Sequence, residues 1–387
     1  MPRIPVESNT ATTVVVEGKS YLAFGGCSYL GLSHHPEVIA AMRSSLDRYG
    51  ISTSASRETT GDTTAHDSLE DELAKFLNTD AALVVPEGYT ANLALAQAVT
   101  QQYRVALIDE KCHRSVAHAV TAAGMQVHTY RHLDAEHAAG LVRTLDRDQG
   151  VVIWTDGVFA ADGAVSPLDK LHSALPGRGL LVVDDCHGFC VLGKNGRGTL
   201  SRFGLDSGPS RARVCITTTL AKGLGCYGGA IAGPRSLITL AQETASVYRG
   251  TTACPPPIVE AAREALRVVQ REAALLDHLH TNVKLMHAAL ARCGVTCTPS
   301  PTPVFTFVLE SETRMAVVHR LMLDSGVLAP LIEYPGGPTA RYFRLSLNAK
   351  HTPADIAKFE QALATAMLST EQRSVTNVLP RSHAARA

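Results

Sequence analysis

The sequence predicts an α/β protein with a mostly parallel central sheet, helices on both faces of that sheet, and a smaller C-terminal α/β domain. Short apolar runs alternate with amphipathic stretches from about residue 80 to residue 235, as expected for strands that are buried on both faces. The chain has 387 residues, of which 45% are hydrophobic, enough for a large core in two or more domains. A second, shorter alternation of helix and strand patterns follows near the C-terminus.

Five runs in the first region have the length and composition of buried strands. They cover residues 81–85, 105–108, 151–154, 180–183 and 214–216. Amphipathic stretches such as 91–100 and 114–123 lie between them and predict helices. Upstream, one helix is predicted over 37–48, between Pro36 and Gly50, and another over 67–77.

The downstream region predicts a second, smaller domain. Three consecutive prolines precede a long helical pattern over 258–291, and a strand (304–309), a helix (313–325), a strand (342–347) and a helix (353–368) follow. We therefore divide the chain into an N-terminal segment (1–40), a large domain (41–250) and a small domain with its connecting helix (251–368). Residues 369–387 lack apolar periodicity and include three arginines, so we expect a disordered tail.

Composition argues against several classes of protein. Lys and Arg balance Asp and Glu at 36 each, which predicts no attraction to nucleic acid or to an anionic membrane. No apolar run approaches the roughly 20 residues of a membrane-spanning helix, and the N-terminus lacks the apolar segment of a secretory signal. Nine scattered cysteines without a CxxC pair are typical of a reduced, cytoplasmic protein.

Cys186, His187 and Cys190 lie close together and raise the question of a metal site. No second ligand pair has metal-site spacing, so we predict no bound metal and interpret the three as residues that follow a buried strand.

Polar residues follow every predicted strand of the large domain. In open α/β sheets, ligands bind beyond the carboxyl ends of the strands, so these residues should gather around a ligand. They are Glu87, Gly88 and Tyr89, then Asp109 and His113, then Thr155 and Asp156, then Asp184 and Asp185, and finally Thr217, Thr218 and Thr219.

Three residues at or shortly after these strand ends match the needs of pyridoxal phosphate (PLP). Lys222 follows a strand and precedes glycines, where a buried amine can lose its proton and bind a carbonyl carbon. Asp184 can pair with a protonated pyridine nitrogen, and His187 can hydrogen-bond near the phenolic oxygen. Each of these residues alone also fits an ordinary surface or strand-end position.

Further residues complete the predicted cofactor site. Gly88 and Tyr89 begin a helix, whose free N–H groups and dipole favour a phosphate. Thr219 can donate to the same phosphate, and His113 can stack on the ring. An unliganded helix start and a structural histidine are the alternatives.

With these motifs in place, the chain resembles the α-oxoamine synthase family of fold-type I PLP enzymes, which includes 8-amino-7-oxononanoate synthase and 2-amino-3-ketobutyrate CoA ligase. The resemblance runs from about residue 28 to 368. Its segments are Tyr29-Leu30-Gly31-Leu32, Gly88-Tyr89-Thr90-Ala91-Asn92, Val183-Asp184-Asp185-Cys186-His187-Gly188, Thr219-Leu220-Ala221-Lys222 and Arg344-Leu345-Ser346-Leu347.

The resemblance implies an aspartate aminotransferase-like fold and a role for each matching residue. Lys222 is similar to the family's Schiff-base lysine, Asp184 to the pyridinium partner, and His113 to the stacking histidine. His187 matches the residue near the phenolic oxygen, and Gly88, Tyr89 and Thr219 match phosphate-binding positions. Arg344 matches the arginine that binds the substrate carboxylate. Thr251 and Thr252 match a segment that reaches the phosphate of the partner subunit, which implies a homodimer with shared active sites.

The implied reaction condenses an amino acid with an acyl thioester of coenzyme A or of a carrier protein, with loss of carbon dioxide, to give an α-amino ketone. Two alternatives stay open: another PLP reaction on the same scaffold, such as transamination, aldol cleavage or decarboxylation, and a non-catalytic binding protein. The sequence departs from the family pattern mainly at substrate-facing positions. These are Cys27, Ser54, Ala55, Glu87, Cys112 and Ala160.

Overall fold

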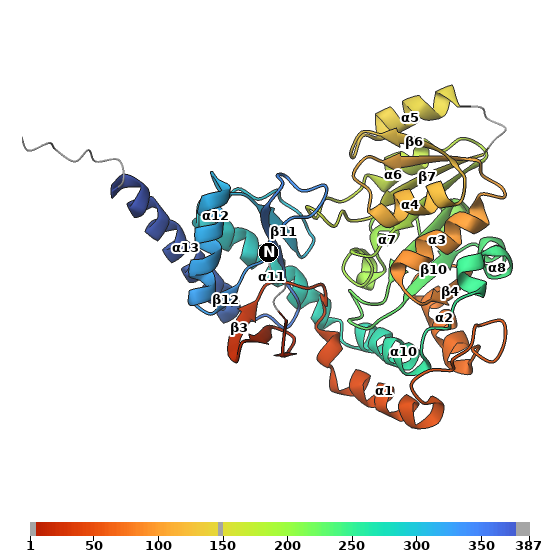
Figure 1. The fold of residues 1–387 in the computed structure, drawn as a ribbon. Helices are drawn as coiled ribbons and strands as arrows, with labels where there is room; N and C mark the ends of the chain where they lie inside the picture. Colours follow the sequence, from red (N-terminus) through yellow and green to blue (C-terminus); the bar gives the residue numbers. More distant parts are fainter. Residues whose placement is uncertain (1–4, 146–149, 377–387) are drawn as a thin grey trace, which may run out of the picture.

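The computed structural model describes residues 5–145 and 150–376 and contains a seven-stranded central sheet. All five predicted strands belong to it, and all of their residues are buried. They are β4 (Ala81–Val85), β5 (Val105–Asp109), β7 (Val151–Asp156), β8 (Gly179–Asp184) and β9 (Val214–Thr219). The spatial order is β4-β10-β9-β8-β7-β5-β6, in which only β10 runs antiparallel to its neighbours (Figure 1). The predicted mostly parallel sheet is therefore confirmed.

Two strands of this sheet are absent from the sequence prediction. β6 (Gln126–Tyr130) is an edge strand with a largely polar, partly exposed sequence, and β10 (Gly229–Gly233) is a run of glycine, alanine and isoleucine. Glycine lowers strand propensity, and an edge strand needs no continuous apolar run, so neither segment has the pattern of a buried strand.

Helices cover both faces of the sheet, as predicted. Alternate residues of β4 enter two separate apolar cores, with Val84 in one and Leu83 in the other, because successive side chains point to opposite faces. The first core includes residues of α2 (Thr64–Phe76), α6 (Leu168–Ser173) and α10 (Pro256–Arg271). The second includes residues of α3 (Gly88–Val99), α4 (Arg114–Ala122) and α8 (Arg235–Thr244).

Four further α-helices complete the described part of this region. They are α1 (Pro36–Tyr49), which packs on α10, and α5 (Ala135–Thr144), α7 (Thr199–Arg202) and α9 (Ser246–Arg249). The predicted helix over 37–48 is thus confirmed one residue wider on each side.

The N-terminal segment joins the C-terminal part of the chain. Strands β1 (Ser8–Asn9), β2 (Thr13–Val16) and β3 (Lys19–Ala23) form a sheet with β12 (Val327–Leu328), in which β12 pairs parallel to β3. The chain then passes beneath the central sheet through α1 (Figure 1). The segment between β3 and α1 brings the hydroxyl of Tyr29 to within 2.6 Å of Nδ1 of His187, just after the carboxyl end of β8.

The C-terminal elements form a third apolar core. They are α11 (Ala274–Arg292), β11 (Val304–Phe307), α12 (Glu312–Asp324), β13 (Leu331–Ile332), β14 (Tyr342–Ser346) and α13 (Pro353–Thr376). The helical pattern over 258–291 is two helices, because the backbone leaves the helical region at Glu272 between α10 and α11.

The sequence prediction placed the start of the disordered tail at residue 369, which is too early. α13 extends to Thr376, so residues 369–376 are helical, and Arg314 on α12 contacts this part through Thr370 at 3.1 Å and Glu371 at 3.0 Å. The last turns of a helix can form without an apolar face, so the absence of apolar periodicity did not show where the helix ends. Residues 377–387 lie outside the described residues.

Residues 5–145 and 150–376 contain neither a membrane-spanning helix nor a cluster of metal ligands. No helix in these ranges is long and apolar enough to cross a bilayer. Within the same ranges, no three His, Cys, Asp or Glu side chains are grouped as a metal site.

Candidate active site

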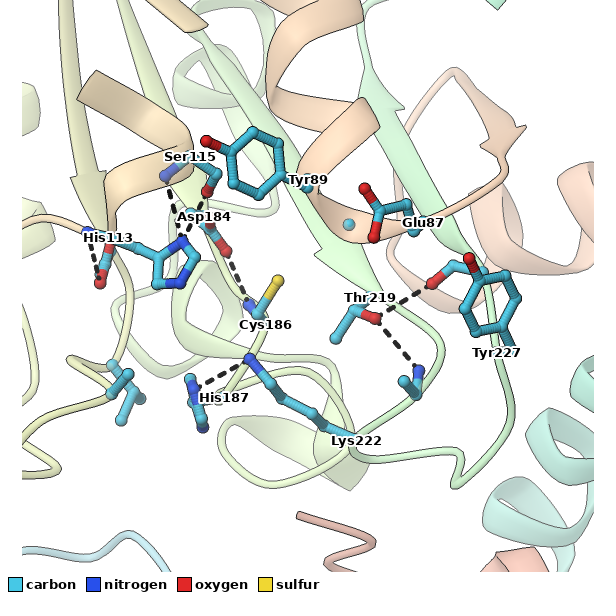
Figure 2. A pocket seen from close by; sticks show the side chains of 16 residues that line it. Glu87, Tyr89, His113, Ser115, Asp184, Cys186, His187, Thr219, Lys222 and Tyr227 are labelled. Atoms are coloured by element: carbon cyan, nitrogen blue, oxygen red, sulfur yellow. Dashed lines mark hydrogen bonds between the residues drawn. The ribbon is translucent and has the colours of Figure 1, made fainter. Parts of the chain in front are cut away.

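A cavity of about 240 Å³ lies at the carboxyl ends of the central strands. Seven of the residues predicted for the cofactor line it: Gly88, Tyr89, His113, Asp184, His187, Thr219 and Lys222. They lie at the last residues of β8 and β9 and in the segments that follow β4, β5, β8 and β9, as the strand-end argument predicts. Figure 2 shows Lys222 pointing toward His187, with Thr219, Glu87 and Tyr227 on another side of the cavity.

Lys222 lies in the turn after β9, and its Nζ is 2.9 Å from Nε2 of His187. The other ring nitrogen of His187, Nδ1, is 2.6 Å from the hydroxyl of Tyr29. Burial lowers the pKa of His187 well below its ordinary value, and the neighbouring Lys222 side chain lowers it further. The imidazole is therefore neutral at physiological pH.

Asp184 ends β8 as a buried carboxylate held by two donors. Its Oδ2 accepts from Nδ2 of Asn92 at 2.7 Å, and its Oδ1 accepts from the backbone N–H of Cys186 at 3.2 Å. Asn92 is itself fixed, because its Oδ1 accepts from the hydroxyl of Thr217 at 2.6 Å. The carboxylate thus has a defined orientation and spare lone pairs.

A second carboxyl group, Asp156, lies beside Asp184. The two residues are register partners at the ends of β7 and β8. Burial raises the pKa of Asp156 well above its ordinary value, and the charge of Asp184 raises it further. Asp156 accepts from the backbone N–H of His113 at 3.1 Å, so it anchors the start of α4.

Gly88 begins α3 directly after β4, where its missing side chain is needed. A Cβ atom there would lie 3.0 Å from the Cβ of Thr219, so Thr219 would have to move by a few tenths of an ångström to accept it. The preceding residue, Glu87, makes no side-chain cap, so the first N–H groups of α3 remain open to a ligand.

Thr219 is engaged differently from our expectation. Its hydroxyl donates to the carbonyl of Gly228 at 3.0 Å and accepts from the backbone N–H of Ala221 at 3.2 Å. The donor that we predicted for a phosphate is therefore already used, and Thr219 braces the turn that carries Lys222.

His113 and Tyr89 form another wall of the cavity. His113 caps α4, with its Nδ1 accepting from the backbone N–H of Ser115 at 3.2 Å. Burial lowers its pKa, which favours a neutral ring that can lie against another ring. Tyr89 hydrogen-bonds to His118. The centroids of the Tyr89 and His113 rings are 6.5 Å apart, and the two rings are arranged edge to face.

Arg344 on β14 lies behind the cavity lining. Its Nε donates to the carbonyl of Ala160 at 2.7 Å, and Ala160 lines the cavity. Burial acts to lower the pKa of Arg344, but the nearby Cys27 and Tyr29 side chains outweigh this effect and raise the pKa above its ordinary value. The guanidinium therefore stays charged. The Nε–H group is therefore engaged, and the guanidinium lies beside Cys27 and Tyr29.

The structure does not bring Thr251 and Thr252 to the cavity of their own chain. Thr252 instead forms a β-bridge with Ser56, and the backbone N–H of Ala253 donates to the carbonyl of Ala55 at 3.0 Å. This segment therefore packs against one of the regions that departs from the family pattern.

Three functional side chains escaped sequence reasoning: Tyr29, Asn92 and Asp156. Tyr29 and Asn92 stand in the motifs quoted above, but nothing in those motifs says that they contact His187 and Asp184. Asp156 was noted as a strand-end residue but was given no role. Its neighbour on the adjacent strand, Asp184, can be identified only from the pairing of β7 with β8.

Comparisons with known proteins agree with this geometry. The family described as aminotransferase class I and II matches residues 19–363. The 8-amino-7-oxononanoate synthase of Thioalkalivibrio sulfidiphilus (strain HL-EbGR7) is 37% identical over 95% of this chain and 93% of that protein. The enzyme of the same name from Methylococcus capsulatus (strain ATCC 33009 / NCIMB 11132 / Bath) is 36% identical over 94% of this chain and 93% of that protein.

A solved structure confirms the fold class. A variant serine palmitoyltransferase from S. paucimobilis with bound PLP–myriocin superposes with a TM-score of 0.89, covering 96% of this chain and 93% of that chain at 23% identity. The chain therefore belongs to the class I and II aminotransferase family, within the α-oxoamine synthase group that its motifs resemble.

Proposed function

We propose that this protein is a PLP-dependent acyltransferase that condenses an amino acid with an acyl thioester, releases carbon dioxide and forms an α-amino ketone. One observation carries the proposal: the amine of Lys222, the carboxylate of Asp184 and the open start of α3 line a single cavity. The relatives named 8-amino-7-oxononanoate synthase, which match nearly the whole chain, support this reaction class.

The residues present fit PLP by the chemistry of their donors. The cofactor has an aldehyde, a pyridine nitrogen and a phosphate, and the cavity offers an amine, an oriented carboxylate and a helix N-terminus. When bound, PLP supplies an electron-poor ring that stabilises negative charge on the α-carbon of an attached amino acid.

Each residue then has a task that its surroundings support. Asp184 would hold the proton on the pyridine nitrogen, with its own orientation fixed by Asn92. Lys222 would bind the aldehyde carbon and, once released by the substrate, carry the α-proton on Nζ. His187 would hydrogen-bond near the phenolic oxygen, and His113 would lie against the ring.

The substrate and phosphate groups have separate sites. Arg344 would bind the amino-acid carboxylate through its terminal nitrogens, since Nε is held by Ala160. The backbone N–H groups at Gly88 and Tyr89 would bind the phosphate, with Thr219 fixing the adjacent turn.

We also infer a homodimer in which Thr251 and Thr252 reach the phosphate of the partner subunit. Their absence from the cavity of their own chain supports a role across an interface. A cytoplasmic location agrees with the nine cysteines, all of which are free thiols.

The test is carbon dioxide release from carboxyl-labelled amino acids by the PLP-loaded protein. We expect release only when an acyl thioester of coenzyme A or of a carrier protein is also present, and loss of release in Lys222→Ala but not in Lys75→Ala, an exposed lysine on α2. Release without any thioester would indicate a decarboxylase, and amino-group transfer to a keto acid would indicate an aminotransferase.

A further inference from the structure

Tyr29 belongs to the segment that crosses from β3 to α1, yet its side chain is fully buried against the active site. It lies 158 positions from His187 in the sequence, and its hydroxyl is 2.6 Å from Nδ1 of that histidine. Lys222 is 2.9 Å from the other ring nitrogen. A continuous line of three polar groups therefore runs from Tyr29 through His187 to the amine.

The direction of the hydrogen bond between Tyr29 and His187 follows from the groups around it. Burial raises the pKa of Tyr29 well above its ordinary value, so the phenol keeps its proton. The Arg344 guanidinium acts on the same phenol, and an arginine can only donate, which leaves the phenol's proton free for another acceptor. The unprotonated nitrogen of a neutral imidazole is the best acceptor within reach, since the thiol of Cys27 accepts only weakly.

This direction determines the tautomer of His187. If Nδ1 accepts from Tyr29, the single ring proton of the neutral imidazole lies on Nε2. An Nε2–H group donates to an amine that has a lone pair and cannot be paired with an ammonium group, which has none. The opposite tautomer would accept from the ammonium form of Lys222 instead.

We propose that Tyr29 is a positioning residue that holds His187 as the Nε2–H tautomer and thereby favours the neutral amine of Lys222. The proton that Lys222 gives up leaves to solvent when the site is open. This inference rests on the proposed function only where the neutral amine of Lys222 is used to bind PLP. The tautomer itself is a property of this chain.

Other charged and titratable groups face this line of residues and must be held constant in any test. Around His187 they are Lys222, Arg344 and His113; around Tyr29 they are Cys27 and Arg344; around Lys222 they include Asp156, Cys186 and Tyr334. Burial and the guanidinium of Arg344 both oppose an imidazolium at His187, so the ring stays neutral whether or not Lys222 carries a proton.

The first experiment measures the protonation of Lys222 directly. PLP is first removed from the full-length protein, which is then treated with trace acetic anhydride at a series of pH values, and labelling of the Lys222 peptide is followed by mass spectrometry. We expect Tyr29→Phe to move the labelling midpoint up by about one pH unit, because either tautomer then becomes accessible. Tyr103→Phe, which removes a phenol that does not line the cavity, should leave the midpoint unchanged. Equal midpoints in Tyr29→Phe and the unaltered protein would overturn the proposal.

A second measurement needs no variant at Tyr29, so it decides the matter even if Tyr29→Phe fails to fold. Nitrogen-15 NMR of the unaltered protein, with the His187 signals assigned by their loss in His187→Gln, should show a protonated Nε2 and an unprotonated Nδ1. The reverse assignment would refute the inference. Neither measurement uses substrate or PLP, so failure here leaves the proposed function standing, and failure of the condensation assay leaves the tautomer standing.

Discussion

Replacing Asp184 with asparagine separates the charge of this residue from its shape. The buried carboxylate accepts from the Cys186 backbone N–H at 3.2 Å and from Asn92 at 2.7 Å. The amide oxygen keeps the first bond, whereas the amide N–H₂ group faces the donor of Asn92. An unsatisfied buried group costs about 1–3 kcal/mol, and relief of the repulsion with Asp156 offsets part of that cost. We therefore expect the free energy of unfolding to change by less than about 2 kcal/mol.

Cofactor binding should suffer far more from Asp184→Asn. Removing one partner of a buried, hydrogen-bonded charge pair costs about 2–5 kcal/mol, which corresponds to roughly 30-fold to several thousand-fold weaker binding. Fluorescence titration of cofactor-free protein with PLP measures this loss, and chemical denaturation measures stability in parallel. Asp169→Asn, at an exposed carboxylate of α6, is the matched control. If Asp184→Asn bound PLP within about threefold of the unaltered protein, the pyridinium pairing would be wrong.

Three further changes probe the rest of the site. Glu87→Ser should tighten PLP binding about 3- to 10-fold in the same titration, because it removes a negative charge from the start of α3 and introduces a capping hydroxyl; weaker binding would place the phosphate elsewhere. Arg344→Lys should lower kcat/KM for the amino acid by about 10- to 100-fold at unchanged PLP affinity, because lysine lacks the two-pronged donor; an unchanged kcat/KM would remove Arg344 from the carboxylate site. Burial raises the pKa of Asp185 to about 7, so the folded protein binds this proton more tightly than the unfolded chain does, and its contribution to the free energy of unfolding falls by roughly 3 kcal/mol as the pH rises from 5 to 8. Asp185→Asn should lose that part of the pH dependence in denaturation curves at pH 5 and pH 8, and identical pH profiles would contradict the assignment.

The central sheet was predictable because strands that are buried on both faces consist of continuous apolar runs in the sequence. The five apolar runs that become β4, β5, β7, β8 and β9 contain residues that are all buried in the structure. β6 and β10 leave no such trace, since one lies at the edge and the other is rich in glycine. The end of α13 was missed for a related reason, because the last turns of a helix can form without an apolar face.

Only the site residues that follow the parallel strands were predictable from the sequence. Lys222, Asp184 and His187 follow parallel strands, and the topology brings such residues together without further information. Tyr29 arrives from an N-terminal segment whose path depends on pairing between β3 and β12, a contact between residues about 300 positions apart in the chain. No local pattern encodes that path. Thr251 and Thr252 have an expected role that depends on a second subunit.

The most direct test of the whole account asks which amine carries the cofactor. The PLP-loaded protein is reduced with borohydride, digested with a protease, and analysed by mass spectrometry for a pyridoxyl phosphate adduct. The account predicts a single modified site at Lys222, next to His187 in the cavity that Asp184 also lines. A stoichiometric adduct on any other lysine, with Lys222 unmodified, would contradict it.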